Sequence, residues 1–169
     1  MLTIENVCST MLQQGFEYGC MAQDTSLAFL VPTHPSKMAG SILKPHAPAL
    51  HCSRVNEEPV LDWHNFVNAY DFQISTYAAR PLVFIKADMS RIADTTDHRF
   101  KAEWRRETEY MPLVNWTKVA STFSGIKVDL TTDPLFPMWD VDTLVVWDAA
   151  CITDVRAFRN VGEWLYEGA

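Results

Sequence analysis

Three short stretches of the 169-residue chain carry residue types that suit chemistry on a charged ligand. They are Arg54, the pair Ser75-Thr76 and the stretch Glu107-Thr108-Glu109. An arginine can bind an anion through parallel hydrogen bonds, and a carboxylate can stabilise developing positive charge. On a strand Glu107 and Glu109 project to the same face, whereas on a helix they lie about 200° apart. Any joint chemistry of the two carboxylates therefore requires an extended segment.

The order Arg, then Ser-Thr, then Glu-x-Glu resembles the motif of the arginine-type ADP-ribosyltransferases, which cleave NAD and transfer ADP-ribose. The resemblance implies NAD as cosubstrate, with Arg54 on its pyrophosphate, Thr76 beside Arg54 in cofactor binding, and Ser75 on the nicotinamide ribose. It implies that Glu109, assisted by Glu107, is the catalytic carboxylate that favours oxocarbenium-like cleavage. Two features depart from the family pattern. Tyr77 stands where the family usually has Ser, and the interval of 21 residues between Arg54 and Ser75 is short for that fold.

The run His51-Cys52-Ser53 offers two other chemistries. It resembles the His-x-Ser element of two-histidine phosphoesterases, in which the His is a general acid or base and the hydroxyl binds phosphate. That family needs a distant second copy, but the other His-x-Ser, His34-Pro35-Ser36, lies close by in sequence. Cys52 could instead be a nucleophile with His64 as base and Asp62 as orienter, although a buried thiol is the simpler interpretation.

The charge balance limits the class of partner. Fourteen Lys and Arg against 21 Asp and Glu give a formal net charge of −7, which disfavours nucleic acid as the main ligand. An acidic surface suits a second hypothesis, a non-catalytic binding or adaptor protein of a mobile element or phage that engages a host protein. The histidines have no spacing typical of metal ligands, so we expect no metal.

The four cysteines are scattered and form no C-x-x-C pair. This spacing favours free thiols in a reducing compartment, and hence a cytoplasmic location. The sequence also shows no secretory signal and no apolar stretch long enough to span a membrane.

Hydrophobic periodicity predicts a single α+β domain over residues 1–169, with a mixed, mainly antiparallel sheet and two to four helices. Helices are expected at residues 3–14, from Pro59 to Tyr70, and over a final stretch from Ile152 to Val161. Strands are expected at residues 27–31, 49–55, 72–77, 81–88, 113–119, 125–130 and 142–148. Loops are expected at residues 32–48, 91–99 and 131–140. Hydrophobic periodicity does not decide whether residues 100–110 form a helix or a strand.

Overall fold

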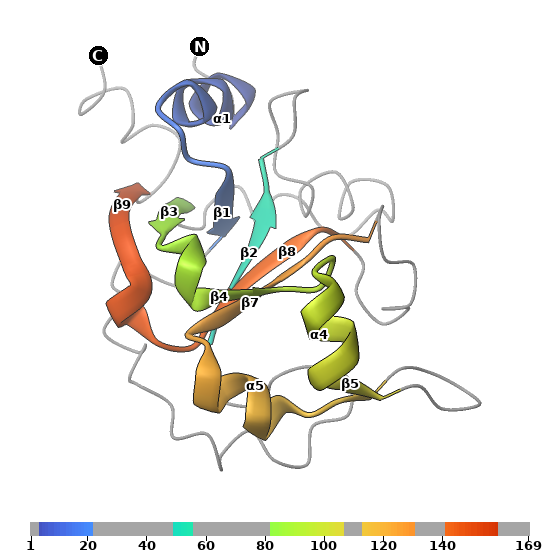
Figure 1. The fold of residues 1–169 in the computed structure, drawn as a ribbon. Helices are drawn as coiled ribbons and strands as arrows, with labels where there is room; N and C mark the ends of the chain where they lie inside the picture. Colours follow the sequence, from blue (N-terminus) through green and yellow to red (C-terminus); the bar gives the residue numbers. More distant parts are fainter. Residues whose placement is uncertain (1–3, 22–48, 56–81, 107–112, 131–140, 159–169) are drawn as a thin grey trace. The chain divides into compact units, whose positions relative to one another are not determined.

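The computed structural model describes residues 4–21, 49–55, 82–106, 113–130 and 141–158 (Figure 1). The chain divides into two compact units, and each is built from segments that are distant in sequence. The first unit comprises Met1–Ser26, Cys52–Lys86 and Ile152–Ala169, and the second comprises Leu27–His51 and Ala87–Cys151.

The first unit contains one helix and most of four strands. These elements are α1 (Ile4–Gln13), β1 (Tyr18–Met21), β2 (Leu50–Arg54), β3 (Leu82–Ala87) and β9 (Ile152–Phe158). Strand β1 pairs antiparallel with β2 on one side and with β3 on the other, and β9 is the other neighbour of β3. The core of this unit brings one face of α1 against β3 and consists of Val7, Cys8, Met11, Phe16, Val55, Leu82 and Phe84.

Helix α1 confirms the helix expected at residues 3–14, and Gly15 ends it as its sequence position suggests. Gly15 has φ +85, and its N–H donates to the carbonyl of Leu12 at 2.9 Å. The N–H of Phe16 donates to the carbonyl of Met11, also at 2.9 Å. These two bonds form a Schellman cap, in which glycine tolerates the left-handed backbone that closes the helix.

The second unit contains two α-helices, two 3₁₀ turns and five short strands among its described residues. The elements are η2 (Met89–Arg91), β4 (Ile92–Asp94), α4 (His98–Glu103), β5 (Arg105–Arg106), β6 (Leu113–Val114), α5 (Trp116–Thr122), β7 (Gly125–Val128), β8 (Thr143–Val146) and η3 (Ala149–Cys151). Strand β7 runs parallel to β4 and antiparallel to β8, and β5 pairs antiparallel with β6.

Aromatic residues of α4 and α5 are buried in the core of this unit. Phe100 and Trp104 follow the helical spacing of α4, and Trp116 and Val119 that of α5. They meet Ile126 and other side chains of β7 and β8 in one buried cluster. Strand β8 confirms the strand predicted at 142–148, and all four of its residues are buried, so both its faces lie in the core.

The α+β class and the mixed, mainly antiparallel pairing are confirmed. The described residues contain three α-helices, within the expected two to four. Strands β2, β3 and β7 confirm the predictions at 49–55, 81–88 and 125–130. The predicted strands at 27–31 and 72–77, the predicted helix from Pro59 to Tyr70 and the predicted loops at 32–48 and 131–140 lie outside the described residues.

Three predicted elements are wrong. The segment predicted as a final helix from Ile152 is strand β9, which lies beside β3. The apolar residues recur every three positions, as in a helix, but the β-branched Ile152, Thr153 and Val155 favour a strand. The loop at 91–99 contains β4 and the start of α4. The polar residues there are turn and cap residues, since Asp97 accepts a hydrogen bond from the N–H of Arg99 and begins the helix.

The third error is the strand predicted at 113–119. Only Leu113–Val114 is extended, and α5 follows because the side chain of Asn115 caps it by accepting a hydrogen bond from the N–H of Lys118 at 3.1 Å. Strand β1 was not predicted. The ambiguity at 100–110 reflects two elements in succession, since α4 ends at Glu103 and β5 begins at Arg105.

Candidate functional site

Arg54, the arginine of the motif, is the last residue of β2. Its side chain is exposed, and its backbone faces Tyr18 across the antiparallel pair of β1 and β2. The other motif residues, Ser75, Thr76, Glu107 and Glu109, lie outside the described residues. The structure therefore describes one of the five residues that the motif singles out.

The chain on either side of Glu107 and Glu109 is nevertheless described. Arg105 pairs with Val114 and Arg106 pairs with Leu113, in an antiparallel register. Arg106 is thus extended and hydrogen-bonded in a ladder immediately before Glu107. A strand at this position is the backbone geometry that places alternate side chains on one face.

The residues next to Arg54 do not suit the other two chemistries. Cys52 is fully buried, and its hydrogen bond with Cys20 together with burial raises the pKa of the Cys52 thiol well above its ordinary value. A buried thiol that stays protonated is a poor nucleophile. Ser53 is 6% exposed, and its hydroxyl oxygen is buried without a hydrogen-bond partner. This burial does not favour contact with a phosphate, whereas His51 on the same strand is exposed.

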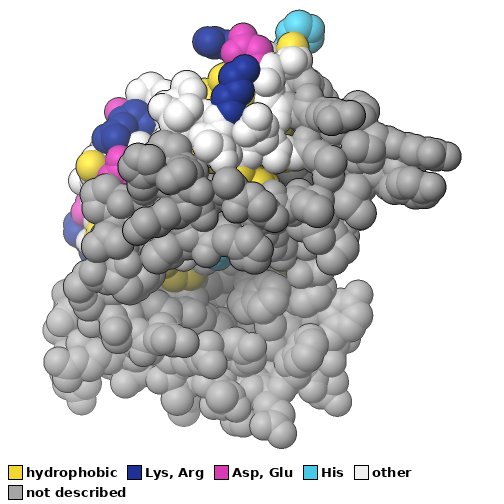
Figure 2. Space-filling model, turned by 90° about the horizontal axis from the view of Figure 1, so that it is seen from below, with side chains coloured by type: hydrophobic (Ala, Val, Ile, Leu, Met, Phe, Trp, Pro, Cys, Tyr) yellow, Lys and Arg dark blue, Asp and Glu magenta, His cyan; other side chains and the backbone are white. Residues whose placement is uncertain are grey.

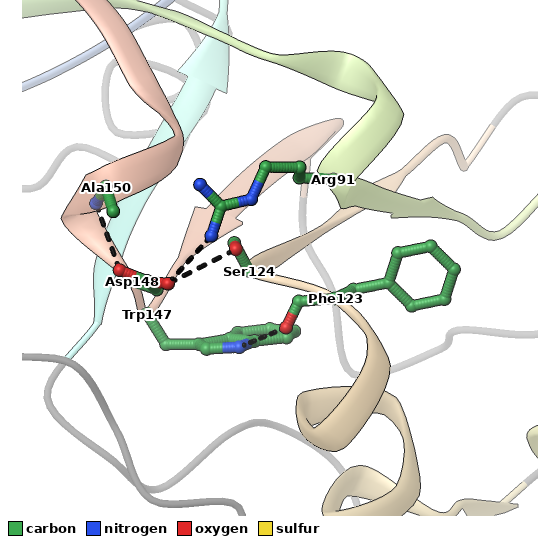
Figure 3. A network of polar contacts seen from close by, with 6 residues as sticks. All are labelled: Arg91, Phe123, Ser124, Trp147, Asp148 and Ala150. Atoms are coloured by element: carbon green, nitrogen blue, oxygen red, sulfur yellow. Dashed lines mark hydrogen bonds and ion pairs between the residues drawn. The ribbon is translucent and has the colours of Figure 1, made fainter.

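The second unit holds a polar cluster that the sequence analysis did not single out (Figure 3). Arg91 Nη2 donates to Asp148 Oδ2 at 3.0 Å, and Ser124 Oγ donates to the same oxygen at 3.4 Å. The other carboxylate oxygen, Oδ1, accepts from the N–H of Ala150 at 3.0 Å. Arg91 is the last residue of η2, Ser124 precedes β7, and Asp148 follows β8 by two residues.

Backbone hydrogen bonds hold these three residues in place. The N–H of Ser124 donates to the carbonyl of Arg91 at 2.7 Å, and the N–H groups of Trp147 and Asp148 donate to the carbonyl of Ser124 at 3.0 and 3.2 Å. Beside the cluster, the indole Nε1 of the buried Trp147 donates to the carbonyl of Phe123 at 2.9 Å (Figure 3). Both oxygens of Asp148 are engaged, so the cluster joins three segments at the ends of η2, β7 and β8 rather than presenting a free base.

A sequence signal for this cluster existed in part. Ser124 precedes the strand predicted at 125–130, and Asp148 ends the strand predicted at 142–148. Nothing local indicates Arg91, because it begins the stretch 91–99 that was predicted as a loop. Cys151 lies close by, and burial raises the pKa of its thiol to about 11.

The described surface carries charges of both signs. Figure 2 shows one face of the molecule, and acidic and basic side chains lie beside one another on its described part. Exposed or half-exposed ion pairs join Arg99 to Glu103 at 3.0 Å and Lys127 to Asp94 at 3.8 Å. Such pairs contribute little to stability in water.

The described residues show neither a metal-binding cluster nor a membrane-spanning helix. They contain no group of three or more His, Cys, Asp or Glu side chains arranged to hold a metal ion. Within the same residues, no helix has the length and apolar character needed to cross a membrane.

Comparisons with known proteins do not add to the site. No family model, no curated protein and no solved structure matches the chain.

Proposed function

We propose that the chain is a small NAD-consuming transferase of the ADP-ribosyltransferase type. The observation that supports the proposal best is the pairing of β5 with β6, which brings the chain to Glu107 in extended form. If that conformation continues to Glu109, the two carboxylates share one face and can reach one bound nucleotide. Arg54, which the proposal assigns to the pyrophosphate, is an exposed residue at the end of β2.

The residues would divide the reaction as follows. Arg54 and Thr76 hold the dinucleotide, and Ser75 orients the ribose next to the nicotinamide. Glu109, with Glu107, provides negative charge near that ribose as its bond to nicotinamide breaks and positive charge develops. The proposal requires Arg54, Ser75 and Glu109 to share one cleft.

The test is release of nicotinamide from NAD by the full chain, measured by chromatography. Glu109→Gln should lower turnover by about 100-fold or more, because it removes the charge that supports the oxocarbenium-like state. The matched control is Glu103→Gln, since Glu103 is an exposed residue of α4 in an ion pair with Arg99. The control should keep full turnover. Equal turnover by both variants, or no cleavage by the unaltered chain, would contradict the proposal.

The second candidate is a non-catalytic binding or adaptor protein that engages another protein, such as a host protein of a phage or mobile element. The net charge of −7 favours it, as does the engagement of Asp148 and Cys52 in structural contacts. A chain that folds normally yet neither binds nor cleaves NAD would favour this candidate over the transferase.

A further inference from the structure

Cys20 and Cys52 lie on neighbouring antiparallel strands, β1 and β2. Tyr18 faces Arg54, and Gly19 faces Ser53. Continuing this register by one residue places Cys20 directly opposite Cys52. Directly opposed residues of an antiparallel pair project to the same face of the sheet, so the two thiols point the same way.

The hydrogen-bond pattern identifies the kind of pair. The N–H of Val55 donates to the carbonyl of Glu17 at 2.7 Å, and these two residues face each other in the same register. Hydrogen-bonded and non-hydrogen-bonded pairs alternate along an antiparallel ladder, so the pair three steps on, Cys20 with Cys52, is of the non-hydrogen-bonded kind. The Cα atoms of such a pair are about 4.5 Å apart. A disulfide spans Cα separations of roughly 4.4–6.8 Å.

The side chains are also in contact. The thiols of Cys20 and Cys52 share a hydrogen bond, which is the largest cause of the raised pKa of Cys52. Cys20 is 9% exposed and Cys52 is not exposed at all. The two sulfur atoms therefore meet in a site from which water is nearly excluded, and both are reduced in the structure.

We propose that Cys20 and Cys52 are a dithiol pair that a small-molecule disulfide, such as oxidised glutathione, converts into a cross-strand disulfide. The thiolate of Cys20, the more exposed residue, attacks one sulfur of the oxidant and releases one thiol. When β1 and β2 open locally, the Cys52 thiol can lose its proton, and its thiolate attacks the Cys20 sulfur of the mixed disulfide and releases the second thiol. The two protons of the protein thiols leave with the two released thiols, so the oxidant is reduced and the protein pair is oxidised.

The bond would link two strands that are distant in sequence. It closes a loop that contains the 31 residues from Met21 to His51. Cross-linking a loop of this size restricts the unfolded chain and stabilises the folded one. Burial slows both formation and reduction of the bond, because reagents reach the sulfur atoms only when β1 and β2 open locally. The other two cysteines are placed differently, since Cys8 lies on α1 and Cys151 belongs to the second unit.

The experiment equilibrates the full chain with oxidised glutathione, then blocks the remaining thiols under denaturing conditions and maps the peptides. Two of the four thiols should disappear, and a peptide joining Cys20 to Cys52 should appear. The midpoint of thermal unfolding should rise by roughly 10 °C, and reductant should reverse the rise.

The controls separate this pair from the other thiols. Cys52→Ala should abolish both the linked peptide and the rise in midpoint, whereas Cys8→Ala and Cys151→Ala should keep both. Where a variant does not fold, the peptide map of the unaltered chain decides. Four free thiols at equilibrium, a link through Cys8 or Cys151, or a glutathione adduct on Cys20 that Cys52 never displaces would overturn the proposal.

Discussion

At the scale of single residues, polar side chains in the described part of the chain mainly close turns and begin helices. Asp97 and Asn115 accept hydrogen bonds from the first turns of α4 and α5. Asp148 is held by several donors, since it accepts from Arg91, Ser124 and the backbone of Ala150. The exposed fractions of its side chain and of Arg91 are 25% and 41%, so solvent screens the ion pair only in part.

Asp148→Ala should therefore destabilise the fold by about 2 kcal/mol, because it removes a half-buried acceptor and leaves its three donors without it. Glu103→Ala is the matched control. Glu103 pairs with Arg99, one helical turn before it, on an exposed face of α4. Its removal should therefore cost about 0.5 kcal/mol or less. Urea unfolding of both variants measures the difference. Equal losses would show that the cluster around Asp148 does not hold these three segments together.

At the scale of elements, the sequence predicts what local pattern and local chemistry determine. Helix α1 has its apolar face and its glycine stop in one continuous stretch, and β8 has four consecutive apolar or β-branched residues. Strands β4 and β9 depend instead on partners far along the chain, namely β7 and β3. Strand β4 has only three residues, and the apolar residues of β9 fit the spacing of a helix equally well. Periodicity within the segment therefore could not identify them.

Close approach of strands makes one glycine of β7 sensitive to substitution. A Cβ on Gly125 would collide with the backbone oxygen of Val145 and would lie 2.8 Å from Cδ1 of Ile92. Gly125→Ala should cost about 3 kcal/mol or more, because neither neighbouring strand can move without breaking its pairing. Gly15→Ala is the comparison, since its nearest atoms belong to the flexible side chain of Lys86 at 3.5 Å. That change should cost about 1 kcal/mol, from the positive φ alone.

The measurement for both glycine variants is the free energy of unfolding in urea. A loss at Gly125 no larger than that at Gly15 would mean that β4, β7 and β8 are more loosely packed than the register implies.

At the scale of the whole molecule, the candidate site could be predicted only as a list of residue types in order. The motif singled out Arg54, and the sequence pattern predicted a strand at 49–55 that contains it. Strand β2 confirms that strand. Whether Arg54, Ser75 and Glu109 meet depends on contacts between segments up to 55 residues apart, which no local pattern encodes. The Arg91, Ser124 and Asp148 cluster was missed for the same reason, since it joins residues up to 57 positions apart.

The two compact units are not independent stretches of chain. The first unit takes three segments and the second takes two, so the chain passes from one unit to the other four times. Neither unit can be cut out as a continuous piece. Because the chain passes repeatedly between the two units, we expect it to unfold as one cooperative unit. The single domain over residues 1–169 stays a prediction.

Hydrogen exchange of backbone amides can test this cooperativity, because the slowest amides open only with global unfolding. Leu144 is 1% exposed on β8, and Leu144→Ala should cost about 2–5 kcal/mol. In a cooperative chain the slowest amides of β3, in the first unit, should then exchange about 30-fold faster or more, as those of β8 should. Met11→Ala, which removes a buried side chain of α1, should have the reciprocal effect on β8. Faster exchange confined to the unit that carries the substitution would show that the two units unfold separately.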